Sequence, residues 1–314
     1  MTDAPRRAKR RYLIIPFALF GIFFAAYSAL WVYGRGIMKD EIAAYIANEE
    51  SMGRKITYES MKIAGYPYNL RAVLDDFVWE DPGQWTWSGE RLNIITLPYD
   101  PSRLIFAPRK AQKLVVDGKS YDIDARAINV SLSDMAYAAE ANDFTATGEE
   151  GVITFNEFRA NWDLNDEGGW VLVAGVRQAR FVDTAEGMID LPYMNLALTQ
   201  GADAMGRITI DSVEGAVSTQ TIPKPTLLKA KGQIGLDGLQ RPEGNITITA
   251  RELPALFDLL KTYELMDAEQ AQQAINAFSG GSGADSEIPL PLTMRDGQLR
   301  MGPIVLGTLD PISF

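Results

Sequence analysis

Cysteine and histidine are both absent from this chain of 314 residues. Without cysteine the chain can form neither a disulfide nor a thiolate nucleophile. Without either residue, Ser-His-Asp and Cys-His catalytic systems are excluded, and a zinc site loses its usual ligands. No serine stands three residues before a lysine, so the S-x-x-K arrangement of Ser-Lys hydrolases is also missing. We therefore predict no catalytic residues, no cofactor and no metal site.

Two acidic segments offer alternatives to this prediction. Asp122 and Asp124 share one face of a predicted strand, as a glycosidase pair would, but in an acidic chain we interpret them as solvated surface. The segment DLNDEGG, residues 163–169, resembles the start of a calcium loop. Its twelfth position is Ala174 instead of a bidentate glutamate, so we predict a polar hairpin tip.

Positive charge is concentrated at the start of the chain. Residues 1–11 carry five arginines and lysines against Asp3 alone, a net charge of +4. The whole chain has a formal net charge of -11, which leaves -15 for the remainder. An acidic body of this kind repels phosphate backbones, so we predict no nucleic-acid partner.

The longest uncharged run directly follows the basic residues. From Tyr12 to Tyr33 there are 22 residues without a charge, enough for a helix to cross the hydrocarbon of a bilayer. We predict a transmembrane helix over 12–33, with a basic cytoplasmic tail over 1–11 and the rest of the chain translocated, because basic residues precede the span. A cleavable signal peptide is the alternative, with Ala26 and Ser28 as small residues for a cleavage site.

The periodicity of the sequence changes twice after this span. Met38, Ile42, Tyr45 and Ile46 recur at helical spacing, which predicts a helical stalk over 34–52 that ends near Gly53. From there to Phe314 apolar and polar residues mostly alternate. Asp-Gly pairs, a strong signal for hairpin turns, occur at residues 117–118, 237–238 and 296–297. We predict a mainly β (α+β) domain over 53–314, built as a large antiparallel sheet or a curved sandwich.

One segment interrupts the strand pattern. Residues 252–278 show helical spacing of leucines and phenylalanines, with Asp267 suited to cap a second helix. We predict a helical pair here, inserted before the last hairpin, and a flexible loop over 279–287 from the segment SGGSGADSE.

Five aromatic residues are the candidates for contact with a ligand or partner. The segment AGYPYNLRAVL, residues 64–74, predicts a rigid reversal between two strands, which Tyr66 and Tyr68 would clamp. Trp79, Trp85 and Trp87 lie close in sequence and could form a patch at a wet boundary. The interpretation we favour for all five is packing, within the hairpin corner for Tyr66 and Tyr68 and over the sheet for the three tryptophans.

Several motifs occur in an order that is similar to one known family. They are the basic residues with a single span, Gly65-Tyr66-Pro67, Trp87, LPYDPSRLIFAP from Leu97 to Pro108, and the closing LTMRDGQLRMGPIVLG. From Tyr12 onward this order resembles the alphaproteobacterial family called domain of unknown function 2125. Residues 296–302 also resemble the tail of AsmA-type proteins, which are anchored β-rich envelope proteins associated with outer-membrane and lipid homeostasis. Neither resemblance supplies a catalytic motif.

These resemblances imply a single-pass protein of the bacterial inner membrane whose bulk lies in the periplasm. Two functions follow as expectations. In the first, an apolar sheet face binds lipid or another amphipathic envelope component. In the second, the domain is a non-catalytic scaffold for envelope proteins. A lipid binder should expose a continuous apolar face, whereas a scaffold should have a closed core. We favour lipid binding.

Overall fold

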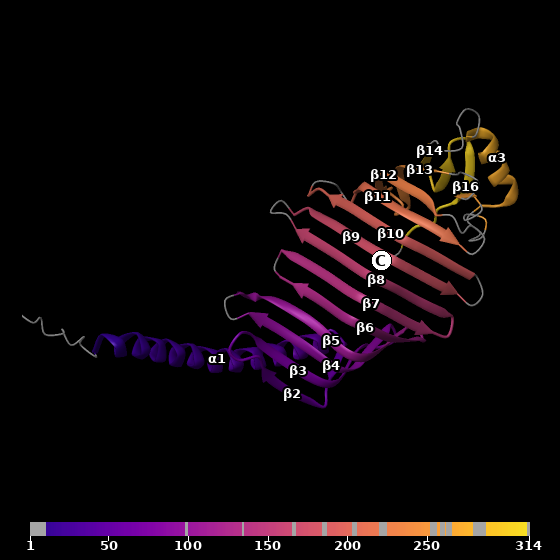
Figure 1. Cartoon of the computed structure of the whole chain (residues 1–314). Helices are drawn as coiled ribbons and strands as arrows, with labels where there is room; N and C mark the ends of the chain where they lie inside the picture. Colours follow the sequence, from indigo (N-terminus) through magenta and orange to yellow (C-terminus); the bar gives the residue numbers. More distant parts are fainter. Residues whose placement is uncertain are drawn as a thin grey trace, which may run out of the picture.

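A long N-terminal helix leads into a single large sheet in the computed structural model of the chain (Figure 1). The structure describes residues 11–97, 100–133, 135–164, 168–183, 187–202, 206–219, 225–251, 256–257, 261, 266–278 and 287–312. Helix α1 runs from Arg11 to Ser51 without interruption. At ~1.5 Å per residue it is about 60 Å long, twice the thickness of a bilayer's hydrocarbon core.

The described residues contain sixteen strands in one antiparallel sheet. From β3 to β16 every strand pairs with its neighbours in sequence, while β1 and β2 both pair with β3. The strands are β1 Lys55–Thr57, β2 Ser60–Ala64, β3 Leu70–Asp81, β4 Trp85–Leu97, β5 Asp100–Val116, β6 Lys119–Leu132, β7 Ala136–Gly148, β8 Gly151–Leu164, β9 Trp170–Asp183, β10 Gly187–Gln200, β11 Ile208–Thr219, β12 Thr226–Leu236, β13 Pro242–Ala250, β14 Ile288–Arg295, β15 Gln298–Met301 and β16 Ile304–Thr308.

The predicted fold class is confirmed, including the turns. The three Asp-Gly pairs connect β5 to β6, β12 to β13 and β14 to β15. Helix α3, Ala268–Phe278, is the second of the two predicted helices. Asp267 caps it, because the backbone N–H of Gln270 donates to Asp267 Oδ1 at 2.7 Å. Most of the first predicted helix, 252–266, and residues 279–286 of the predicted loop lie outside the described residues.

The two ends of the sheet are the places where apolar residues are packed into cores. At one end α1 lies against β1 and β3, and at the other α3 lies beside β16 (Figure 1). The distal core contains Phe257, Leu290 and Met301, each no more than 2 % exposed. Between these cores no described helix covers strands β6 to β10. The only buried apolar residues in these five strands are Ala141, Ala146 and Ala179.

The two faces of the sheet differ in polarity over most of its width, from β6 to β13. Directly paired residues of antiparallel strands point to the same face. One such row is apolar in every strand from β3 to β14. Its members are Ala72, Ile94, Phe106, Val130, Ala139, Ala160, Ala174, Leu196, Val213, Ala230, Ile248 and Leu290. We call this row the apolar row and its side of the sheet the inner face.

The neighbouring row on the outer face is mostly polar. Its members from β6 to β13 are Asn129, Glu140, Arg159, Gly175, Asn195, Glu214, Lys229 and Thr249. Since this face carries charged and amide side chains, it is suited to water. The inner face therefore has the composition of a core, yet over β6 to β10 no described element lies on it.

Strict alternation of side chains breaks once along several of these strands. Asp76, Lys110, Asp143 and Gln178, in β3, β5, β7 and β9, adopt positive φ values between 48° and 67°. Phe155 and Phe158 in β8 are three residues apart, yet their rings lie 6.0 Å from each other. Such a break resets the alternation, as a bulge does, so that apolar residues on both halves of a strand reach the inner face.

Candidate functional site

The outer half of α1, from Trp31 to Ser51, packs on the inner face of the sheet at its first strands. Met38 and Ile42 are buried, and they belong to one apolar cluster with Leu74, Phe77 and Leu92 of β3 and β4. The helical spacing of Met38, Ile42, Tyr45 and Ile46 therefore produces the helix face that meets the sheet.

A network of charges fixes the end of this helix to the sheet. Glu49 is 3 % exposed, and its carboxylate lies 3.2 Å from Arg54. Arg54 also pairs with Asp81 at the end of β3, at 3.2 Å. Beside it, burial and then the neighbouring Glu49 raise the pKa of Tyr45, so this phenol stays neutral at physiological pH. The network holds α1 at a defined distance from β3.

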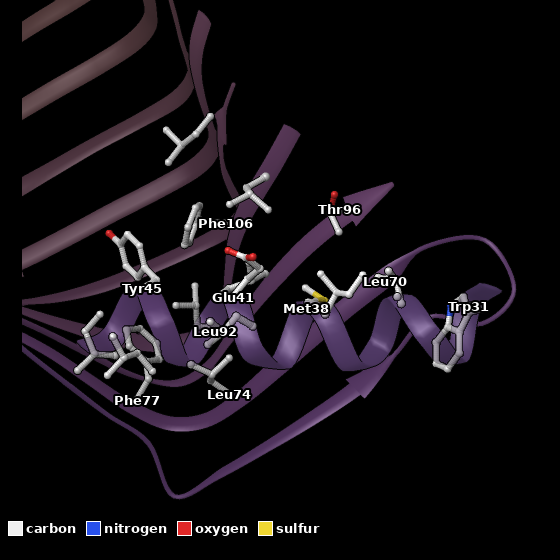
Figure 2. A pocket seen from close by; sticks show the side chains of 18 of the residues that line it. Trp31, Met38, Glu41, Tyr45, Leu70, Leu74, Phe77, Leu92, Thr96 and Phe106 are labelled. Carbon is white, nitrogen blue, oxygen red and sulfur yellow. The ribbon is translucent and has the colours of Figure 1, made fainter. Parts of the chain in front are cut away.

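A cavity of about 690 Å³ lies between α1 and the inner face. Figure 2 shows its side chains converging from the helix and from β3, β4 and β5. The helix contributes Tyr27, Leu30, Trp31, Tyr33, Gly34, Ile37, Met38, Glu41, Ile42, Tyr45 and Ile46. The strands contribute Ile56, Leu70, Leu74, Phe77, Trp79, Leu92, Ile94, Thr96, Leu104, Phe106 and Leu132. The cavity is large enough for part of a drug-sized or lipid ligand.

The cavity lining is almost entirely apolar. Glu41 is the one charged residue among the described residues that line it, and in Figure 2 its carboxylate points toward Phe106. Apart from Glu41, polar atoms come from Thr96 and from tyrosine and tryptophan side chains. Such a lining binds hydrocarbon by excluding water and offers little to a sugar, a nucleotide or a metal ion.

The cavity is continuous with two other features of the molecule. Ile94 and Phe106 belong both to its lining and to the apolar row, so the cavity lies on the inner face and its lining is continuous with that row. Tyr27, Leu30, Trp31 and Tyr33, at its other end, lie in the predicted transmembrane segment. One apolar surface thus extends from the N-terminal helix across the sheet.

The reversal at residues 65–69 is attached to the N-terminal helix. Trp31 Nε1 donates to the carbonyl of Asn69 at 3.0 Å, and the hydroxyls of Ser28 and Tyr66 lie 2.7 Å apart. The Tyr27 hydroxyl donates to the Pro67 carbonyl. The ring of Tyr66 also meets that of Trp31 edge-on, at 5.4 Å. These contacts make the turn between β2 and β3 a clamp on the helix.

The structure separates the five predicted contact residues into two groups. Tyr66 lies against α1, and Tyr68, beside it, is 82 % exposed. The three tryptophans lie together on β3 and β4. The ring centre of Trp79 is 5.9 Å from that of Trp85 and 6.4 Å from that of Trp87. Of the three, only Trp79 is among the described residues that line the cavity. The role of all five residues as ligand contacts stays a prediction.

The remaining lining residues were not predicted as a site. Glu41, Leu92 and Phe106 come from three elements, and only the pairing of β3, β4 and β5 with α1 beside them brings them together. One signal for the site was present in the sequence. Glu41 follows Met38 by three residues, so it lies on the apolar side of the predicted stalk, where a charged residue is unusual. Among the described residues, no cluster of three acidic, histidine or cysteine side chains could hold a metal ion.

Comparison with protein-family models identifies the family of the chain. The family model described as "Uncharacterized protein conserved in bacteria (DUF2125)" matches residues 31–164 and 110–310. The chain belongs to this family. The matched residues begin at Trp31, so in this DUF2125 protein they include the outer half of α1, most of the residues that line the cavity and all the described strands. No curated protein and no solved structure matches the chain.

Proposed function

We propose that this DUF2125 protein is a membrane-anchored protein of the bacterial cell envelope that binds the acyl chains of a membrane lipid. The single observation that carries the proposal is the continuity of the cavity with both the N-terminal helix and the open inner face. Acyl chains are the apolar ligands available beside a membrane span, and both the cavity lining and the apolar row match their chemistry.

The anchor itself is supported by the composition and exposure of α1. The helix is long and apolar enough to cross a membrane, and Phe17, Phe20 and Phe23 on it are each at least 67 % exposed. Phenylalanines this exposed fit a helix surrounded by lipid. With basic residues before the span, we place the N-terminus in the cytoplasm, a stalk over 34–52 and the sheet over 53–314 in the periplasm.

The contacts of the turn at 65–69 support an uncleaved anchor over a signal peptide. Cleavage after Ser28 would remove Tyr27 and Ser28, which contact Pro67 and Tyr66, and cleavage after Ala26 would leave them at a free end of the helix. Because these residues form side-chain bonds with the sheet, the helix acts as part of the folded protein.

The open inner face favours lipid binding over the scaffold alternative. A scaffold needs a closed core, but the large apolar side chains of β6 to β10 are half-buried or exposed, including Trp162 at 43 %. The apolar row crosses twelve strands, roughly 50 Å at ~4.8 Å between strands. Open apolar surface of this extent is characteristic of a binding face. The resemblance of residues 296–302 to AsmA-type tails agrees with this proposal.

Native mass spectrometry of the detergent-extracted full chain tests the proposal. We expect a lipid to remain bound to the wild-type protein. Leu132→Asp places a carboxylate in the cavity and should weaken the affinity for the lipid at least tenfold, because a charge against hydrocarbon costs more than ~1.4 kcal/mol. Ser131→Asp changes the adjacent residue, which points to the outer face, and should retain the lipid. Loss of lipid from both variants, or from neither, would contradict the proposal.

A further inference from the structure

The β2–β3 turn contacts α1 at a depth where the helix should still be inside the membrane. Tyr12 to Trp31 are 20 residues, which is the length that crosses ~30 Å of hydrocarbon. The basic cluster of residues 1–11 ends at Arg11, so we place the inner edge of the span there. Trp31 then lies at the outer edge of the hydrocarbon, in the position where aromatic residues anchor spans.

The turn reaches below Trp31 on the helix. The Tyr66 hydroxyl meets Ser28, and the Tyr66 ring lies 6.2 Å from that of Phe24. At ~1.5 Å per residue, Ser28 and Phe24 lie about 4 Å and 10 Å deeper than Trp31. The end of the turn therefore cannot stand clear of the bilayer while α1 spans it.

The side chains of the turn suit this depth. Residues 65–69 carry no charge, and Tyr66 and Tyr68 are aromatic residues with polar ends, the type enriched at membrane interfaces. Tyr68 is 82 % exposed and its side chain has no hydrogen-bond partner among the described residues. The first charges beyond the tip are Lys62 in β2 and Arg71 in β3. Both side chains are cationic and are therefore attracted to phosphate headgroups, although the domain as a whole is acidic.

We propose that the tip of the β2–β3 turn, residues 65–69, inserts into the outer leaflet of the membrane at the boundary between headgroups and acyl chains. Tyr68 enters the lipid, and Tyr66 and Pro67 hold the turn on α1. The sheet thus has two attachments to the bilayer, the helix and the turn, and the cavity between them stays beside the lipid. This inference rests on the proposed membrane anchor, but not on lipid binding in the cavity.

The absence of cysteine permits a test by single-cysteine labelling of the full chain. Tyr68→Cys, Leu19→Cys and Leu239→Cys each introduce one thiol at an exposed side chain, for an environment-sensitive fluorophore. Leu19 lies in the middle of the proposed span, and Leu239 lies in the β12–β13 turn, far along the sheet (Figure 1). The labelled proteins are reconstituted into vesicles of phosphatidylethanolamine and phosphatidylglycerol, with nitroxide lipids as quenchers.

We expect the fluorophore at Tyr68 to emit at shorter wavelength than in water and to be quenched most by a nitroxide near the glycerol end of the acyl chain. The fluorophore at Leu19 should be quenched most by a nitroxide at mid-chain, and that at Leu239 by neither. Water-like, unquenched emission at Tyr68 together with quenching at Leu19 would overturn insertion of the turn while leaving the anchor intact. An unquenched Leu19 would overturn the anchor and with it this inference. Neither result depends on whether a lipid occupies the cavity.

Discussion

Trp31 on the N-terminal helix donates its indole hydrogen bond to the backbone carbonyl of Asn69, 38 residues away, at 3.0 Å. Trp31→Phe keeps an aromatic ring at this position but removes the donor together with part of the contact area of the indole. A partly buried carbonyl then loses its partner, at a cost of about 1 kcal/mol. We expect the melting temperature of the extracted protein to fall by about 2–4 °C, measured by near-ultraviolet circular dichroism. Trp162→Phe, on the open inner face, is the matched control and should change it by less.

The β2–β3 turn, which holds α1, requires glycine at position 65 for two reasons that can be tested separately. The φ of Gly65 is +104°, and a Cβ placed there would lie 2.6 Å from the backbone carbonyl oxygen of Asn69, which cannot move away as the side-chain Oδ1 at 1.9 Å can. Gly53 shares the positive φ, at +85°, but has open space around it. Gly53→Ala should therefore cost about 1–2 kcal/mol from backbone strain alone. Gly65→Ala should cost at least ~2 kcal/mol more, measured by chemical denaturation of both variants. Equal losses would show that the contact with Asn69 is unimportant.

Glu41 predicts the headgroup preference of the proposed lipid site. A carboxylate in an apolar cavity repels an anionic headgroup by about 2 kcal/mol at roughly 8 Å with an effective dielectric constant of 20, before solvent screening. Glu41→Gln should therefore increase binding of phosphatidylglycerol about 3- to 10-fold and leave phosphatidylethanolamine nearly unchanged. Competition between the two lipids in native mass spectra measures this ratio. Glu50→Gln, on the same helix and not among the lining residues, is the control.

Asp75 predicts an acid-sensitive step in stability. Hydrogen bonds from Arg91 and then Ser60 hold the pKa of Asp75 below its usual value. A lowered pKa in the folded state stabilises the protein above the ordinary carboxyl range, and this contribution is lost as the pH falls through the lowered pKa. Asp75→Asn should therefore reduce the melting temperature at pH 7, and the difference from wild type should shrink as the pH falls below the ordinary carboxyl range and vanish below the lowered pKa. An unchanged difference at low pH would contradict this origin.

Much of the fold was predictable because it depends on local signals. Strand ends at the Asp-Gly pairs, the reversal after Gly65 and the cap at Asp267 each follow from a few adjacent residues. A meander of antiparallel strands then follows from short connections. The breaks in alternation at Asp76, Lys110, Asp143 and Gln178 were not predicted, because these residues share no sequence signal. Of their three residue types, only Asp is common at positive φ.

The candidate site was predictable only in part. The sequence identified the aromatic residues of β3 and β4 and the apolar side of the stalk. It did not indicate that the two meet, because the distance between α1 and the inner face depends on contacts such as Arg54 with Glu49 and Asp81. Nor did it indicate that the face over β6 to β10 is uncovered, since alternating strands look the same whether a second layer packs on them or not.

The order of strands has a consequence for biogenesis. Each strand from β3 onward pairs with the next one in the chain. The partner of every new strand is therefore already formed when that strand folds. Contacts between residues close in sequence favour rapid folding. In the topology that we propose, the sheet can therefore assemble progressively as the chain crosses the membrane, starting from the edge that α1 covers. Each completed strand also satisfies the exposed edge of the one before it, which limits the time available for aggregation.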